Sequence, residues 1–153
     1  MPSLPSPARA DALAAPSFTL SPRHRTTVRA IAGALFEHEG GPTPAQLDAV
    51  VATYEAHVGA VSMQLRPVLL VALDFVRWLP VLLFVAARPF EDLDVDERVR
   101  LLERMERSRF TPLVLAFVAY KTLLTMIFFE MPEELRAMNY PGLERKRWLR
   151  AAA

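Results

Sequence analysis

The chain has 153 residues, enough for one domain of ordinary size and too few for two. Hydrophobic residues make up 52% and charged residues 23%, so the chain can build a sizeable core and is not globally disordered. There is no cysteine, which excludes disulfides, thiolate metal sites and a cysteine nucleophile. The net charge of +1 gives no general attraction to nucleic acid, and three histidines and five glycines poorly supply a multi-histidine metal centre or a glycine-rich nucleotide cradle.

Residues 1–19 are typical of a flexible, disordered arm. The first twenty residues hold four of the 13 prolines and show no hydrophobic periodicity. Arg9 and Asp11 interrupt the apolar run that a secretory signal needs, and no arginine pair marks twin-arginine export. We therefore expect a cytoplasmic protein, with the inner face of the membrane as the alternative location.

Two helices with one apolar face follow the arm. The first begins at Ser21 and Pro22, a good N-cap followed by a residue preset for the first turn, and ends at the glycine pair 40–41. The second begins at a capping box formed by Thr43 and Gln46. Pro67 stops or kinks it. Its apolar face consists of Leu47, Val50, Val51, Tyr54, Val58 and Val61.

Two further segments are apolar on nearly every side. Residues 67–87 carry charges only at Asp74 and Arg77, and Pro80 should kink this helix. Residues 110–129 carry a single charge, Lys121. Helices of this kind lie in a core, against a partner or in a bilayer. The charges interrupt both segments, so that neither has the roughly 20 uninterrupted apolar residues of a typical membrane span. A core or a subunit contact is therefore favoured over a membrane span.

The charges inside the apolar segments predict a structural ion pair. Asp74 and Arg77 are three residues apart and can neutralise each other. Lys121 is expected to meet Asp74 inside the helical packing, because an unpaired buried charge costs several kcal/mol. A role for Asp74 as a general acid or base is the less favoured alternative.

The remaining segments are polar. Asp94 and Glu97 open a solvated amphipathic helix in which arginines and glutamates alternate, so that charge pairs along the helix are expected. A short helix is predicted from Pro132, and the run from Tyr140 to Leu143 predicts a type II turn before a basic tail.

No strand pattern occurs, so the predicted fold is all-α. We expect a single domain of about five or six helices over residues 20–149, followed by a tail at residues 150–153. The three histidines, His24, His38 and His57, lack the spacing of metal ligands and are expected at the surface. The usual hydrolase, nucleotide-binding and metalloprotease motifs are missing, and we expect no catalytic, cofactor-binding or metal-binding residue in this chain.

A family resemblance emerges after Phe90. It rests on Phe90, Leu93-Asp94, Glu97-Arg98, Leu101 to Arg104, Ser108-Arg109, Lys121, Phe129, Pro132-Glu133, Leu135 and Asn139 to Gly142. This succession resembles the small accessory module of glucose–methanol–choline-type flavoprotein dehydrogenases, including the subunit 3 family of gluconate 2-dehydrogenase. It is also similar to the helical segment that precedes the flavin domain of long-chain alcohol oxidases. The opening of the same module matches the stretch from Leu20 to Leu35.

The resemblance implies a non-catalytic subunit of a flavin-dependent alcohol, sugar or steroid oxidoreductase. The FAD and the catalytic residues would then belong to the large partner subunit. A membrane-associated helical hairpin made of residues 67–87 and 110–129, with no enzyme partner, is the alternative. We expect the partner interface to consist of Phe110, Leu113, Phe117, Tyr120, Phe128, Tyr140, Pro141, Gly142, Arg145, Arg147 and Trp148.

Overall fold

The structure is a computed structural model that describes residues 18–37, 41–132 and 134. This part of the chain is all-helical, which confirms the predicted fold class. The elements in chain order are α2 (Pro22–Leu35), α3 (Pro44–Ala60), α4 (Arg66–Leu82), the 3₁₀ turn η1 (Phe90–Asp92), α5 (Val95–Glu106) and α6 (Thr111–Phe129). The predicted turn at Tyr140 to Leu143 and the basic tail lie outside the described residues.

Three predicted helix starts are confirmed by their capping contacts. The backbone N–H of His24 donates to Ser21 Oγ at 3.3 Å at the start of α2. Thr43 and Gln46 exchange hydrogen bonds of 2.8 and 3.2 Å at the start of α3. Before α5, the backbone N–H of Asp94 donates to a side-chain oxygen of Glu97 at 3.1 Å.

The helix ends differ more from the prediction. The first helix ends at Leu35, five residues before the glycine pair. The second ends at Ala60, well before Pro67, which instead occupies the first turn of α4. Helix α4 stops at Leu82, two residues after Pro80, where the sequence predicted a kinked continuation to residue 87.

A Schellman motif closes α4. The N–H of Val85 donates to the carbonyl of Pro80 at 2.8 Å, and the N–H of Phe84 donates to the carbonyl of Val81 at 3.1 Å. Phe84 takes the left-handed conformation that this motif requires, with φ +54°. Glycine is usual at this position, because a side chain there is strained by roughly 1–2 kcal/mol. No glycine marks this helix end in the sequence.

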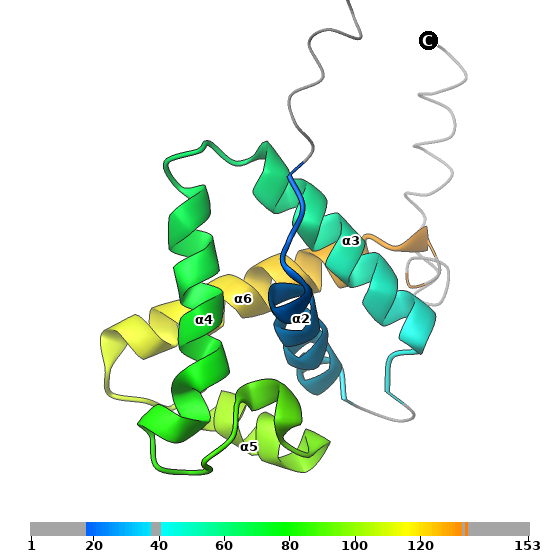
Figure 1. The fold of residues 1–153 in the computed structure, drawn as a ribbon. Coiled ribbons are helices and arrows are strands. Elements are labelled where there is room, and N and C mark those ends of the chain that lie inside the picture. Colours follow the sequence, from blue (N-terminus) through cyan, green and yellow to red (C-terminus); the bar gives the residue numbers. More distant parts are fainter. Residues whose placement is uncertain (1–17, 38–40, 133, 135–153) are drawn as a thin grey trace, which may run out of the picture.

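Helix α2 lies in the middle of the bundle (Figure 1). It contacts α3, α4, α5 and η1, while α6 passes behind α4 and packs against α3 and α5. One continuous core results, and its largest fully buried side chains are Tyr54, Phe90, Ile31, Leu73, Leu79, Met105 and Leu124. This single core agrees with the single domain expected from the sequence.

The folded part begins before residue 20. Phe18, which the sequence assigned to the arm, packs against the core, and the guanidinium of Arg66 lies 4.7 Å from its ring centroid. Arg66 also donates to the carbonyls of Gly59 at 2.8 Å and of Val58 and Val61 at 3.3 Å. A side chain at Gly59 would bring its Cβ within 3.3 Å of Phe18 Cβ. Arg66 therefore ties Phe18, the end of α3 and the start of α4 together.

Candidate functional site

Helix α6 has an inner face in the core and an apolar outer face. The inner residues are Leu113, Phe117, Tyr120, Leu124, Ile127 and Phe128, all at most 6% exposed. The outer residues Leu115, Val118, Met126 and Phe129 are between 39% and 62% exposed and recur along one side of the helix. Ala119 and Thr122 lie between them, also exposed, so this side carries no charge. We call these six residues the α6 outer face.

Four residues of the predicted partner interface are therefore corrected. Leu113, Phe117, Tyr120 and Phe128 are core residues and cannot meet a partner without unfolding. The physical reason is their position, because all four lie on the side of α6 that packs against the rest of the bundle and they belong to its core. Phe110 remains exposed, as the prediction requires. Tyr140, Pro141, Gly142, Arg145, Arg147 and Trp148 lie outside the described residues.

Helix α4 carries a second exposed apolar stripe. Val68, Val71, Trp78 and Leu82 are between 48% and 66% exposed and follow one another at spacings that keep them on one side. The half-buried Phe75 completes the series. Two helices of the described part, α4 and α6, thus each expose a continuous apolar stripe to solvent, which is more than scattered exposed side chains would give.

The predicted ion pair of Asp74 with Arg77 and Lys121 is wrong. Asp74 faces α2, where its Oδ1 lies 3.1 Å from His24 Nε2 and its Oδ2 lies 3.9 Å from Arg23. Arg77 faces η1 instead, and its Nε lies 2.9 Å from Glu91 Oε1. Residues three apart on a helix can meet, but here each side chain has a partner on a different neighbouring element, α2 for Asp74 and η1 for Arg77.

Lys121 also has another partner. Its Nζ lies 3.0 Å from Glu106 Oε1 and 5.1 Å from the ring centroid of Phe117. Both charged side chains of this pair are half exposed, so the pair contributes about 1 kcal/mol at most. Lys121 therefore reaches the surface beside α5 and does not enter the core.

A small polar cluster lies where α2, α3, α4 and α6 meet. His24 is 6% exposed, which corrects the expected surface position, and its Nε2–H donates to the Asp74 carboxylate. The hydroxyl of Tyr120 donates to the carbonyl of Leu69 at 3.2 Å. The hydroxyl of Tyr54 is buried without a hydrogen-bond partner of acceptable geometry among the described residues.

Burial makes both tyrosines of this cluster weaker acids than a tyrosine in water. It raises the pKa of Tyr54 to about 12, and the neighbouring Tyr120 hydroxyl offsets part of that effect. Burial is also the largest cause of the raised pKa of Tyr120, followed by the proximity of Tyr54 and of the negative charge on Asp74. His24, Tyr54 and Tyr120 are each at most 6% exposed, so we assign this cluster a packing role.

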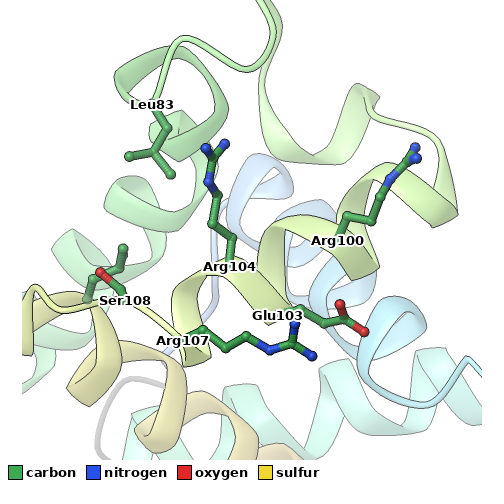
Figure 2. A pocket seen from close by; sticks show the side chains of 7 residues that line it. Leu83, Arg100, Glu103, Arg104, Arg107 and Ser108 are labelled. Carbon is green, nitrogen blue, oxygen red and sulfur yellow. The ribbon is translucent and has the colours of Figure 1, made fainter.

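The end of α4, the C-terminal half of α5 and the first turn of α6 enclose a shallow depression of about 570 Å³. We call it the arginine pocket, and it is lined by Leu83, Arg100, Glu103, Arg104, Arg107, Ser108 and Leu113. Figure 2 shows Arg104 extending toward Leu83 at the end of α4, whereas Arg107 points away from Leu83. None of its three arginines belongs to an ion pair of the described residues.

The expected charge pairs along α5 are thus missing among the described residues, and the sequence pattern did not predict the arginine pocket. Two glutamates of α5 pair outside the helix, Glu97 with Arg88 and Glu106 with Lys121. The alternating charges predicted ion pairs between glutamates and arginines of the same helix. Residue spacing alone cannot show that basic residues outside the helix form ion pairs with these glutamates.

Known proteins supply no family assignment for this arrangement. No protein-family model, curated protein or solved structure matches the chain. Within the described part, no cluster of three or more histidine or carboxylate side chains could hold a metal ion. Helix α6 is the one described helix that is long and apolar enough to cross a membrane, and a core helix meets the same criterion.

Proposed function

We propose that this protein is a non-catalytic accessory subunit that docks on a larger protein through the α6 outer face. The observation that carries the proposal is the exposed, uncharged apolar side of α6, whose opposite side already fills the core. Obligate interfaces resemble a domain core cut in half, and a helix that is apolar on both sides fits such an interface.

The partner that we propose is the large flavoprotein subunit of a glucose–methanol–choline-type oxidoreductase acting on an alcohol, a sugar or a steroid. Support for this partner class is the residue pattern that begins at Phe90 and continues through Lys121 and Phe129. The sequence of this chain has no glycine-rich dinucleotide motif, so the FAD and the reacting groups belong to the partner in this proposal.

Co-purification tests the proposal directly. The tagged chain, expressed together with its candidate flavoprotein, should retain that flavoprotein and its yellow FAD absorbance. The double variant Val118→Glu/Met126→Glu should lose most of the retained FAD with unchanged helix content, because two carboxylates in a desolvated contact lack partners.

The matched control is Ala56→Glu, which adds a carboxylate to an exposed position of α3. This variant should retain the flavoprotein as the parent chain does. If the parent chain purifies alone as a monodisperse monomer, or if the double variant retains as much FAD as the control, the proposed function is wrong.

A further inference from the structure

The arginine pocket combines an unusual concentration of positive charge with little compensation. Arg100, Arg104 and Arg107 line it, and Glu103 is the single carboxylate among the lining residues. The charges of α5 are separated along the helix, with Asp94 and Asp96 at its start and the arginines of the pocket toward its end. A guanidinium without a carboxylate partner is well suited to bind a phosphate group, because its fork of N–H donors matches the phosphate oxygens.

Exposed apolar side chains lie close in the chain to two of the pocket's lining residues. Leu82, Phe84 and Val85 surround the lining residue Leu83 in the chain, and they are 55%, 97% and 45% exposed. Phe110, 61% exposed, precedes the first turn of α6, which contributes Leu113 to the lining. We call Leu82, Phe84, Val85 and Phe110 the apolar tip.

Phe84 is the most informative member of the tip. Its backbone is held in the left-handed conformation by the two hydrogen bonds that close α4, and its ring touches almost nothing of its own chain. Burial within the fold therefore does not offset the backbone strain. A bulky apolar residue that is both strained and exposed suggests a contact outside the domain.

We propose that the arginine pocket and the apolar tip together dock the protein on an anionic phospholipid surface. The apolar tip enters the boundary between headgroups and acyl chains, and the guanidiniums of the pocket bind lipid phosphates beside it. Interfacial anchors have this composition, with aromatic and aliphatic side chains next to arginine or lysine. The proposal concerns another surface than the α6 outer face, so either can fail without the other.

Charge complementarity, together with the exposed apolar side chains, favours a lipid surface over free phosphate. The pocket is open and shallow, and free phosphate would not account for four exposed apolar side chains so close in the chain to its lining residues. An anionic membrane presents many phosphates in one plane together with an apolar layer a few ångströms below them. Both halves of the observed surface then have a counterpart.

Vesicle co-sedimentation of the full chain tests the proposal. The protein should bind phosphatidylglycerol-containing vesicles, bind pure phosphatidylcholine vesicles much less, and lose binding as the salt concentration rises. The double variant Arg104→Gln/Arg107→Gln should bind about 30-fold more weakly, since each arginine near an anionic surface contributes about 1 kcal/mol and 1.4 kcal/mol is a factor of ten. Inorganic phosphate at millimolar concentration should not displace the protein beyond the effect of equal ionic strength.

Phe84→Gly separates docking from folding. This variant removes the strain and should unfold at a higher denaturant concentration than the parent chain, while its vesicle binding falls about tenfold. The matched controls are Met63→Gly, an 82% exposed apolar residue in the α3–α4 turn, and Arg25→Gln/Arg29→Gln on α2, which removes the same charge as the pocket variant. Both controls should bind vesicles as the parent chain does.

Several outcomes overturn the proposal. The first is equal binding to anionic and neutral vesicles, and the second is no vesicle binding at all. The third is parental binding by Phe84→Gly and the pocket variant, which would place the contact in another part of the chain. If the pocket and tip variants lose the co-purified flavoprotein but bind vesicles like the parent, the surface is a protein interface and the lipid proposal is wrong.

Discussion

At the scale of single residues, His24 and Asp74 make the shorter of two polar contacts between α2 and α4. The imidazole is buried, whereas the carboxylate side chain is 37% exposed. Water can therefore solvate Asp74 but has little access to the ring nitrogen that points at it. The histidine is the group that depends on this contact, because a buried donor without an acceptor is costly.

Asp74→Ala should lower the free energy of unfolding by about 1 kcal/mol, because it leaves His24 Nε2 without its acceptor. Asp48→Ala is the matched control, since it also removes a helical carboxylate paired with an arginine, Arg29, at the surface. That control should cost about 0.5 kcal/mol or less. Urea unfolding of both variants gives the comparison, and equal losses would show that the His24 contact contributes nothing of its own.

At the scale of secondary-structure elements, the turn between α3 and α4 depends on one side chain. The three carbonyls that Arg66 binds lie at or just after the end of α3, where helical carbonyls lack partners inside the helix. Arg66 itself belongs to the first turn of α4. A charged donor from one helix thus closes the end of its neighbour and holds Phe18 on the pair.

Arg66→Met should cost about 2 kcal/mol of unfolding free energy, because it keeps the aliphatic stem but removes donors to three carbonyls. Arg100→Met is the control, since Arg100 is exposed and makes no ion pair with the described residues. That change should alter stability by less than about 0.5 kcal/mol. Thermal unfolding followed by circular dichroism measures both, and a loss in the control as large as that of Arg66→Met would contradict the assigned role.

At the scale of the whole molecule, the buried tyrosines couple folding to alkaline pH. Tyr54 has a pKa of about 12 in the fold and about 10 in the unfolded chain, and the pKa of Tyr120 is raised as well. Above pH 10 the unfolded chain releases these protons while the folded protein keeps them. The unfolded state then binds fewer protons, so the free energy of unfolding falls as pH rises.

The two tyrosines should therefore leave the free energy of unfolding unchanged between neutral pH and about pH 9, and should lower it progressively above about pH 10. Tyr54→Phe should reduce the slope of this decline and cost little at neutral pH, because its hydroxyl has no well-formed hydrogen bond to lose. Urea unfolding at several pH values measures the slope. An unchanged slope in Tyr54→Phe would mean that other groups cause the alkaline loss.

The sequence was sufficient for the helix starts and the fold class, because capping residues act within three or four positions of the chain. Ser21, Thr43 and Asp94 each mark a start correctly. It was insufficient for long-range pairing. Asp74 and Lys121 share an apolar environment in the sequence, yet they do not pair with each other. Asp74 pairs with His24 of α2, and Lys121 pairs with Glu106 of α5.

The candidate site was less predictable than the fold for a related reason. Hydrophobicity identified residues 110–129 as important, but a helix that is apolar on every side does not indicate which side faces the core. Phe117 and Phe128 turn inward, and Val118 and Met126 turn outward. The neighbours of Leu83 could not be recognised either, because nothing in the sequence places the end of α4 beside α5.

Phe84, the left-handed residue that closes α4, should respond differently to selection for stability and to selection for function. A library screened only for heat resistance should accumulate glycine at position 84, because glycine adopts φ +54° without a steric penalty. A library screened for the protein's activity in the cell should keep a large apolar residue there if the ring has a contact to make. The two screens should therefore diverge at position 84, and sequencing the survivors of both would reveal whether the strain is maintained for a purpose.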